Sequence, residues 1–298
     1  MIDYHCHLLP GLDDGPSEGE ESLAMAKALA DFGFREVCCT PHCIKGHYEI
    51  SPVEVREAVR KLQARLDFEE IALKLHPGME YHLDECFEQY AANLLPLGGS
   101  KLVLCEAPPQ AHPGLVAEMV GLIVVQGFIP LIAHPERSDV IWEMLEEENR
   151  NAERAARNAE SHDPQHVTSD EDPARPRSFW RRFFASRAPA TPSADNSKFK
   201  IQNSKLAPAS PELPETCLYQ ANLCSFTGYY GPKPQRRAYE LLQRGIYHCL
   251  ASDLHDARSA AACLEAAREK LEFNPALQKL GAFVAPQGQG GSDQLAFW

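Results

Sequence analysis

The sequence opens with MIDYHCH (residues 1–7), a strand-like run in which every second residue from Asp3 is a potential metal ligand. Side chains on a β-strand alternate between its two faces, so Asp3, His5 and His7 point to the same side. Two imidazoles that share a face can bind one cation. A single His-x-His pair does not define a metal site, so the prediction depends on whether later strands bring further ligands to the same place.

Composition restricts the class of protein. The chain has 298 residues, 44% of them hydrophobic, and a formal net charge of −13. The apolar content predicts a globular protein with a sizeable core, and the negative charge argues against nucleic acid as a partner. The most apolar segment, residues 115–133, is interrupted by Glu118, Gly127 and Pro130. We therefore expect a helix, a turn and a strand there, and no transmembrane segment.

The ten cysteines lead to an expectation about location. Several of them, including Cys38 and Cys105, lie in predicted core strands, and a strand that begins at Ile2 leaves no room for a secretory leader. We therefore expect reduced thiols and a cytoplasmic protein. No cysteine has an arginine six positions downstream, so the C-x5-R phosphate loop of cysteine-based phosphatases is absent.

Strand-like and helical segments alternate along most of the chain. The predicted strands lie near residues 2–7, 35–40, 71–75, 101–104, 128–133, 217–223 and 247–251. Seven strand-then-helix units around one core predict a parallel α/β fold, a distorted (β/α)7 TIM-like barrel formed by residues 1–145 and 216–285. Ser17 and Glu20 have the spacing of a capping box, which predicts the start of the first helix.

Two segments lie outside this alternation. Residues 146–215 have no sustained apolar period, which predicts a long disordered insertion, and residues 286–298 are Gly- and Gln-rich, which predicts a flexible tail. Within the insertion, residues 175–187 interleave arginines with Trp180 and Phe183. Two interpretations stay open, an accidental apolar cluster or a docking spot for an acidic membrane surface or a partner protein.

Polar residues of metal-ligand type follow six of the predicted strands. They are His5, His7, Asp14, His42, Glu80, Glu106, His134, Asp253 and His255. In parallel barrels the carboxyl ends of all strands meet at one rim, so these side chains are expected to converge there. So many buried carboxylates and imidazoles repel and desolvate one another unless cations neutralise them. Mixed nitrogen and oxygen ligands suit Zn, Mn or Fe, and nine ligands suit two or three ions.

Each residue also has a purely structural interpretation. His42 follows Thr-Pro and is compatible with a hydrogen-bonded, helix-capping histidine. Glu80 and Glu106 are compatible with rim carboxylates that pair with a cation such as Lys101. Asp253 is compatible with a helix N-cap. The prediction of a metal centre therefore rests on the whole set.

The set resembles the PHP (polymerase and histidinol phosphatase) superfamily, and most closely its CpsB/CapC branch of metal-dependent protein-tyrosine phosphatases. The motifs that carry the resemblance are DYHCH (3–7), LPGLDDGP (9–16), TPH (40–42), PGME (77–80), AHPER (133–137) and ASDLH (251–255). DYHCH matches the whole superfamily, whereas LPGLDDGP and AHPER match this branch. The motifs span the chain apart from the insertion and the tail.

The resemblance implies a PHP-fold barrel with a three-metal cluster, most often of manganese, that hydrolyses phosphotyrosine. The implied substrate is the C-terminal tail of a membrane-associated tyrosine kinase that controls capsule or exopolysaccharide synthesis, and the resemblance leaves room for a homo-oligomer. His5, His7, Glu80 and Asp253 would hold one ion. Glu80 would bridge to a second ion with Glu106 and His134, and Asp14, His42 and His255 would complete the cluster.

The resemblance also implies catalytic roles. Arg137 would clamp the phosphoryl oxygens, and its structural alternative is a salt bridge to Glu136 or to another carboxylate at the rim. His42 or Asp14 would serve as proton donor to the leaving phenolate. The chain departs from the family pattern at its long insertion and at Cys224, where the family has a glycine in the loop 222–226.

Two other functions fit the same residues. One is the hydrolysis of a small alkyl phosphate, as in histidinol-phosphatase-like enzymes. The other is a regulatory protein that binds the kinase and whose own catalysis is weakened.

Overall fold

The computed structural model describes residues 1–160 and 212–285. The chain forms two compact units, one of residues 1–148 and 210–298 and the other of residues 149–209. The fold and the site described below belong to the first unit. The predicted cluster at residues 175–187, most of the predicted insertion and the predicted tail lie outside the described residues.

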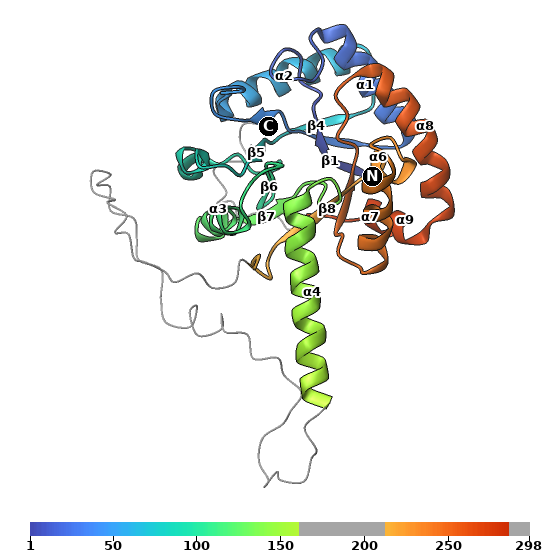
Figure 1. Cartoon of the computed structure of the whole chain (residues 1–298). Helices are drawn as coiled ribbons and strands as arrows, with labels where there is room; N and C mark the ends of the chain where they lie inside the picture. The colour runs from blue at the N-terminus through green and yellow to red at the C-terminus, as the bar shows by residue number, and fades with distance from the viewer. Residues whose placement is uncertain (161–211, 286–298) are drawn as a thin grey trace, which may run out of the picture. The chain divides into compact units, whose positions relative to one another are not determined.

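Nine β-strands form the centre of the first unit (Figure 1). Their bounds are β1 Ile2–Cys6, β2 Glu36–Cys39, β3 His42–Cys43, β4 Lys74–Pro77, β5 Glu80–His82, β6 Leu102–Glu106, β7 Ile129–Ile132, β8 Leu218–Asn222 and β9 Cys249–Ala251. They form a three-stranded sheet in the order β1-β2-β4 and a six-stranded sheet in the order β3-β5-β6-β7-β8-β9. Every paired strand is parallel to its neighbour, which confirms the predicted parallel α/β fold.

The boundary between the two sheets lies at two prolines. Pro41 separates β2 from β3, and Pro77 is the last residue of β4, which Gly78 and Met79 separate from β5. Proline has no N–H to donate to a strand ladder, so the pairing breaks there. Gly78 permits the close approach at the break, because a Cβ on it would lie 2.6 Å from Leu97 Cδ2. On the opposite side, the backbone N–H of Asp253, just after β9, donates to the carbonyl of His5 in β1 at 2.7 Å.

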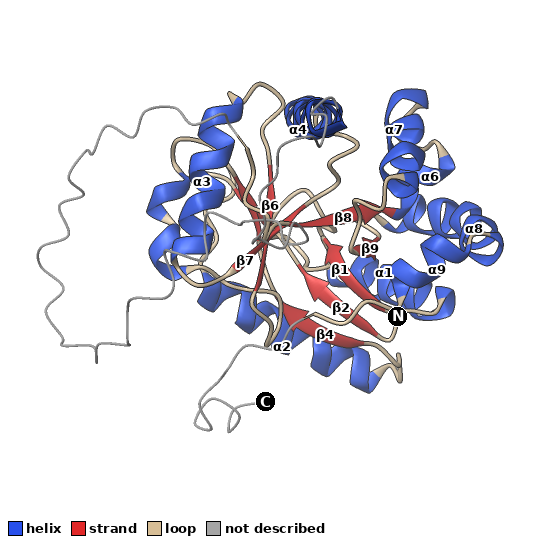
Figure 2. Ribbon diagram, turned by 90° about the horizontal axis from the view of Figure 1, so that it is seen from below, coloured by secondary structure: helices blue, strands red, loops and turns tan. Residues whose placement is uncertain are grey.

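The helices surround the strands (Figure 2). They are α1 Gly19–Phe32, α2 Pro52–Phe68, α3 Pro113–Val125, α4 Asp139–Glu160, α6 Leu223–Thr227, α7 Pro232–Gln243, α8 Ala257–Phe273 and α9 Pro275–Gly281, with short 3-10 turns at Phe87–Gln89 and Ala91–Asn93. The predicted capping box at Ser17 is wrong, because α1 begins after Glu18, whose side chain makes no cap hydrogen bond. The capping box is instead at Ser51 and Glu54, where it begins α2.

Alternation along the strands separates two groups of apolar side chains. In β6, Val103 and Cys105 pack in the larger cluster, with the helices. Leu102 and Leu104 pack in a smaller cluster formed mostly by residues of the other strands. Glu106 is two residues past Leu104 and therefore continues this strand-lined series. The inner face of the strands thus ends in polar groups at their carboxyl ends.

The predicted start of the insertion at residue 146 is wrong, because α4 continues to Glu160. The segment EEENRNAERAARNAE (146–160) lacks an apolar period but consists mainly of strong helix formers. A side-chain pair at i,i+4 spacing, Asn149 with Glu153 at 3.1 Å, adds local support. Helix propensity, and not the apolar pattern, therefore determines the secondary structure of this segment.

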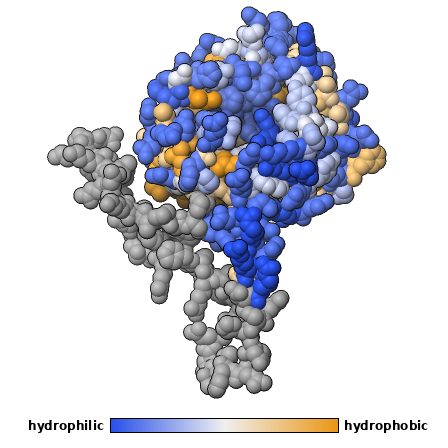
Figure 3. All heavy atoms as spheres, viewed as in Figure 1, coloured by the Kyte–Doolittle hydropathy of each residue, from blue (hydrophilic) through white to orange (hydrophobic). Residues whose placement is uncertain are grey.

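The expectation of ten reduced thiols is wrong for one pair. Cys224 in α6 and Cys263 in α8 are joined by a disulfide, with Cα atoms 5.7 Å apart. The other eight cysteines, all within the described residues, are free. Elsewhere the surface is largely polar on the face drawn in Figure 3. None of the helices in residues 1–160 and 212–285 combines the length and apolar character needed to cross a bilayer.

Candidate metal centre

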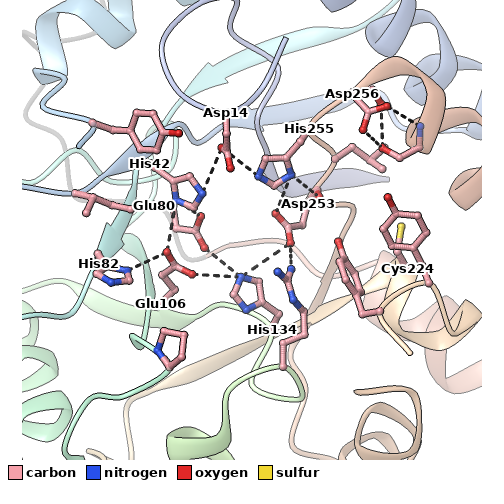
Figure 4. A pocket seen from close by; sticks show the side chains of 18 of the residues that line it. Asp14, His42, Glu80, His82, Glu106, His134, Cys224, Asp253, His255 and Asp256 are labelled. Atoms are coloured by element: carbon pink, nitrogen blue, oxygen red, sulfur yellow. Dashed lines mark hydrogen bonds and ion pairs between the residues drawn. The ribbon is translucent and has the colours of Figure 1, made fainter. Parts of the chain in front are cut away.

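A cavity of about 560 Å³ opens at the carboxyl ends of the strands, and seven of the nine predicted ligand residues line it (Figure 4). All nine come together. Their ligand atoms form four groups, each with its atoms within 4.8 Å of one another: His7, Asp14, His42 and His255; His5, His134 and Asp253; His5, His7 and Glu80; and His42, Glu80 and Glu106. His5, His7, His42 and Glu80 each belong to two groups. The groups therefore share residues and form one cluster.

Glu80 lies at the middle of this cluster and is buried. Its Oε2 is 3.0 Å from His42 Nδ1, 3.2 Å from His5 Nε2 and 3.3 Å from His7 Nε2. None of these contacts has hydrogen-bond geometry, so the buried Oε2 and His42 Nδ1 are left without a hydrogen-bond partner. Burial alone would raise the pKa of Glu80, but the imidazoles of His5, His134 and His42 outweigh it and hold the pKa well below its usual range.

The two histidines of β1 are oriented by hydrogen bonds on their outer nitrogens. His5 Nδ1 donates to Gln220 Oε1 at 3.1 Å, and His7 Nδ1 donates to Asp13 Oδ2 at 2.6 Å. With Nδ1 used in this way, Nε2 is the nitrogen that each imidazole can offer to a cation, and the two Nε2 atoms face each other at 3.0 Å. This arrangement of an oriented imidazole with its second nitrogen free is typical of metal-ligating histidines.

Two further residues of the cluster have unusual backbone conformations. His134 has φ 31° and Asp253 has φ 52°, values in the left-handed region that non-glycine residues seldom adopt. Hydrogen bonds hold both backbones, because His134 N–H donates to Gln220 Oε1 at 3.3 Å and Asp253 N–H donates to His5 O at 2.7 Å. Strain of this kind clusters at functional sites, where the surrounding structure maintains it.

The carboxylate of Asp253 has three kinds of partner. Its Oδ1 is 3.2 Å from His5 Nε2, while its Oδ2 accepts from Asn222 Nδ2 at 2.9 Å and pairs with the Arg137 guanidinium. Burial would raise its pKa, but His5, His7 and Arg137 together hold the pKa well below the usual range. Asp253 is therefore ionised although it is buried.

Four residues lie closer to solvent, namely Asp14, His42, Glu106 and His255. His42 Nε2 and His255 Nε2 are each 3.5 Å from Asp14 Oδ1. The rings of His7 and His255 stack with centroids 3.9 Å apart. Glu106 Oε1 is 3.1 Å from His82 Nδ1. Asp14, His42 and His255 thus close the cluster on its open side.

The structural alternatives can now be compared with the geometry. The N-cap of α8 is Asp256, so the N-cap interpretation of Asp253 is wrong. Arg137 forms a salt bridge with Asp253, so its structural alternative holds for another carboxylate at the rim and not for Glu136. The buried carboxylate of Glu136 accepts from Tyr247 Oη at 2.8 Å and from Asn222 N at 3.1 Å. Glu80 contacts imidazoles and not Lys101.

Several residues that build the site lie outside the predicted ligand set. Asp13 and Gln220 orient the β1 histidines, His82 pairs with Glu106, and Tyr230 packs under Arg137 with its ring centroid 4.2 Å from the guanidinium carbon. Asp13 stands in the quoted motif LPGLDDGP, so the motif itself was the available signal. No strand-end rule identifies Gln220, which lies in the middle of β8.

The cluster fits divalent cations. Glu80 and Asp253 are ionised at its centre, and burial alone would lower the pKa of His5, but Glu80 and Asp253 raise it to about 9. The buried carboxylates thus attract positive charge. A bound metal ion neutralises them more effectively than protons on the histidines do. Three buried atoms of the cluster have no hydrogen-bond partner among the described residues: Glu80 Oε2, His42 Nδ1 and His134 Nδ1. Imidazole with carboxylate suits a first-row transition metal.

Fold and site together define an α/β protein with a cluster of imidazoles and carboxylates at the carboxyl ends of its parallel strands. Comparison with known families identifies the group more closely. Residues 1–154, about half of the chain, match the family described as "Capsular polysaccharide synthesis, CpsB/CapC". The chain belongs to this family.

Individual relatives agree with this assignment. The chain is 40% identical over 145 residues to the tyrosine-protein phosphatase YwqE of Bacillus subtilis, a match that covers 48% of this chain and 57% of the relative. It is 33% identical over 150 residues to the tyrosine-protein phosphatase CpsB of Streptococcus pneumoniae, covering 47% and 59%. The matched segments thus span less than two thirds of these relatives.

The fold itself is similar to a solved structure. The structure is described as YwqE from Bacillus subtilis and CpsB from Streptococcus pneumoniae, "unique metal-dependent tyrosine phosphatases". The two share a TM-score of 0.63 at 24% identity, over 98% of this chain and 100% of the other. At this identity the likeness establishes the fold.

Proposed function

We propose that this chain is a metal-dependent protein-tyrosine phosphatase that hydrolyses phosphotyrosine. The observation that carries the proposal is Glu80 Oε2, which three imidazole nitrogens approach within 3.3 Å without hydrogen-bond geometry. Imidazoles and a carboxylate that converge in this way without hydrogen bonding to one another suit a cation bound between them. The names of the relatives, YwqE and CpsB, support the choice of substrate.

The proposal includes a closed barrel. The breaks that divide β2 from β3 and β4 from β5 leave seven strand units, and hydrogen bonds from the β9 end to β1 join the first and last units. We infer a distorted (β/α)7 barrel from residues 1–145 and 216–285, with the site at its carboxyl-terminal rim. Enzymes with such barrels place their reactive groups at that rim.

The nine ligands are proposed to hold two or three divalent cations, manganese before iron or zinc. His5, His7, Glu80 and Asp253 would hold the first. Glu80, Glu106 and His134 would hold the second. Asp14, His42 and His255, whose ligand atoms group with that of His7, would complete a third site. When bound, the cations supply Lewis acidity that activates water near neutral pH and neutralises charge on the phosphoryl oxygens.

The reaction is the attack of water on phosphorus with loss of the tyrosine phenolate, so that one P–O bond forms and another breaks. Arg137 lines the cavity and uses one nitrogen for Asp253, which leaves other guanidinium N–H groups for phosphoryl oxygens. Its stacking on Tyr230 fixes the plane of the guanidinium. Asp14, at the open side of the cluster, and His42 are the proposed sources of the proton for the leaving oxygen.

The proposed substrate protein is a membrane-associated tyrosine kinase, dephosphorylated on its C-terminal tail in the control of capsule or exopolysaccharide synthesis, in the cytoplasm. The family description, capsular polysaccharide synthesis, supports this setting. The net charge of −13 and the acidic cavity floor are consistent with a phosphoprotein bound through metal ions and Arg137, since the protein surface alone would repel phosphate.

A substrate comparison tests the proposal. The purified full chain is assayed with Mn²⁺, Fe²⁺ and Zn²⁺ on a phosphotyrosine peptide and on histidinol phosphate, and its metal content is measured. We expect metal-dependent turnover with kcat/KM higher for the peptide. Preference for histidinol phosphate would replace the proposal with a small-molecule phosphatase. Failure to hydrolyse even p-nitrophenyl phosphate, with metal bound, would favour a kinase-binding regulator.

A further inference from the structure

Three tyrosines stand at the mouth of the cavity, above the charged floor. They are Tyr48, Tyr229 and Tyr230, which we call the aromatic collar. The apolar residues Ile44 and Pro109 line the same mouth. The proposed ligands need none of these five residues, so the collar calls for a separate explanation.

The Tyr48 side of the collar is fixed by backbone hydrogen bonds. Ile44 N donates to Tyr48 O at 3.0 Å, and Tyr48 N donates to Ile44 O at 2.9 Å. This closed pair holds the loop after β3 in one shape. The Tyr48 ring stacks on His42 with centroids 5.9 Å apart and planes 14° apart. Tyr48 is thus held directly beside a proposed metal ligand.

The other side of the collar follows α6. Gly228 ends this helix with φ 84°, a left-handed conformation that suits glycine, and Tyr229 N donates back to Cys224 O at 3.3 Å. The rings of Tyr229 and Tyr230 are perpendicular, 5.0 Å apart. Tyr230 is fixed between Arg137, which lies over its ring, and Asn222, which donates to its hydroxyl.

Tyr229 differs from its neighbour in being 55% exposed. No hydrogen bond to its hydroxyl is found among the described residues, whereas Tyr230 is half-buried against Arg137. Among the large hydrophobic side chains that are strongly exposed in the described residues, Tyr229 alone lines this cavity. Its ring contacts Tyr230, which in turn packs against Arg137, so Tyr229 lines the cavity beside the proposed phosphoryl site.

We propose that the aromatic collar binds the phenyl ring of the substrate, and that Tyr229 is its specificity-determining residue, selecting aryl over alkyl phosphates. The inference rests on the proposed function and deepens it. The floor would bind the phosphoryl group, and the ring would pack against Tyr229 while Tyr48 limits its position from the His42 side. Aromatic rings pair preferentially in offset or edge-to-face arrangements, which the perpendicular pair of tyrosines offers.

The test compares Tyr229→Ala and Tyr229→Phe with the wild type. Each is assayed on phenyl phosphate and on n-butyl phosphate, and kcat/KM is measured for both. Because one aromatic pair contributes on the order of a tenfold change in affinity, Tyr229→Ala should lower the ratio of phenyl to butyl turnover by about tenfold, mainly through KM. Tyr229→Phe should keep the ratio. Phe68→Ala, at an exposed phenylalanine of α2, is the matched control.

Binding provides a readout that does not depend on turnover. Calorimetry of the metal-loaded protein should give tighter binding of phenylphosphonate than of methylphosphonate, and Tyr229→Ala should remove that preference. An unchanged preference in Tyr229→Ala, or an equal loss with both compounds, overturns the inference. A wild type that hydrolyses neither ester contradicts the proposed function, and the phosphonate comparison still decides whether the collar selects an aromatic ring.

Discussion

The proposed metal ligands fall into two regions that differ in burial and in support from neighbouring residues. The inner ligands are His5, His7, Glu80, His134 and Asp253, with side chains 0–8% exposed. The outer ligands are Asp14, His42, Glu106 and His255, with side chains 14–50% exposed. Both regions contain imidazoles and carboxylates, so the ligand types alone do not separate them.

The two regions do differ in how neighbouring residues hold the ligand side chains. Gln220 orients His5, Asp13 orients His7, and Asn222 with Arg137 holds Asp253. Asp14, by contrast, has only two imidazoles at 3.5 Å. A ligand that is already oriented loses little conformational entropy when a cation binds. We therefore expect the inner region to bind its cation more tightly than the outer region does.

The largest effect should come from Glu80→Gln. Glu80 is the one carboxylate shared by two of the ligand groups, and a neutral amide cannot replace its charge. Since metal ions supply several kcal/mol of transition-state stabilisation, kcat/KM should fall on the order of 10³-fold. Metal content after dialysis should fall with it. Glu88→Gln, at an exposed glutamate, is the matched control, and full metal content in Glu80→Gln would refute the central role of this residue.

Removal of the disulfide should lower the stability of the fold and leave the metal site intact. Cys263→Ser opens a crosslink between positions 39 residues apart, which by loop-closure entropy stabilises the fold by about 3–4 kcal/mol. Denaturant unfolding should measure that loss, and a reductant should produce the same loss in the wild type. Metal affinity should stay unchanged, because hydrogen bonds and not the crosslink orient the inner ligands. Cys86→Ser, at a free cysteine, is the control.

Equal unfolding free energies for the wild type and Cys263→Ser would mean that the pair does not crosslink in solution. A loss of metal affinity together with stability would mean that α6 and α8 orient Asp253 through their covalent link. Either result would change the account of what keeps the inner region ordered.

Asp13→Asn tests the support of an inner histidine without removing a ligand. The carboxylate of Asp13 accepts from His7 Nδ1 and from the N–H groups of His42 and Gly15. An amide keeps the size but weakens the preference for the Nδ1–H tautomer of His7. Metal affinity should fall roughly 10- to 100-fold, as for other residues that orient a ligating histidine. Competition with a chelator measures it, with Asp31→Asn on the exposed face of α1 as control.

These supporting residues also mark the limit of what the sequence could predict. Strand-end positions pointed to His5, Glu80 and Asp253, because parallel strands must bring their carboxyl ends together. Gln220 lies within β8, and only the pairing of β8 with β7 and β9 in the folded sheet brings it to face His5. The sequence does not encode that pairing in any local pattern.

Local structure was harder to predict where two signals competed. Ser17 and Glu20 have the capping spacing, yet α1 begins at Gly19, while Ser51 forms the actual capping box before Pro52. The residues after 146 lack an apolar period, yet form the end of α4 through helix propensity. Cys224 and Cys263 meet only because α6 and α8 pack together, which no spacing in the sequence indicates.

Asp14→Asn should have the smallest effect and gives the direct comparison with Asp13→Asn, its neighbour in the chain. Asp14 is half exposed, and its carboxylate approaches His42 and His255 without a hydrogen bond to hold it. Its loss should weaken the outer site and leave His42 as the proposed proton source, so the protein should release one cation more easily and lose about tenfold in kcat/KM, or ~1.4 kcal/mol.

Titration of metal content against a chelator separates the two variants. Asp14→Asn should shift only the weakest binding step, whereas Asp13→Asn should shift the tightest one, which depends on His7. The opposite outcome is that Asp14→Asn removes the tightest-bound cation. In that case exposure and support would not determine the cation affinities of the sites, and the net charge of each ligand group would have to explain them. Because the two aspartates are adjacent in sequence and identical in chemistry, any difference between the variants reflects only what each carboxylate contacts.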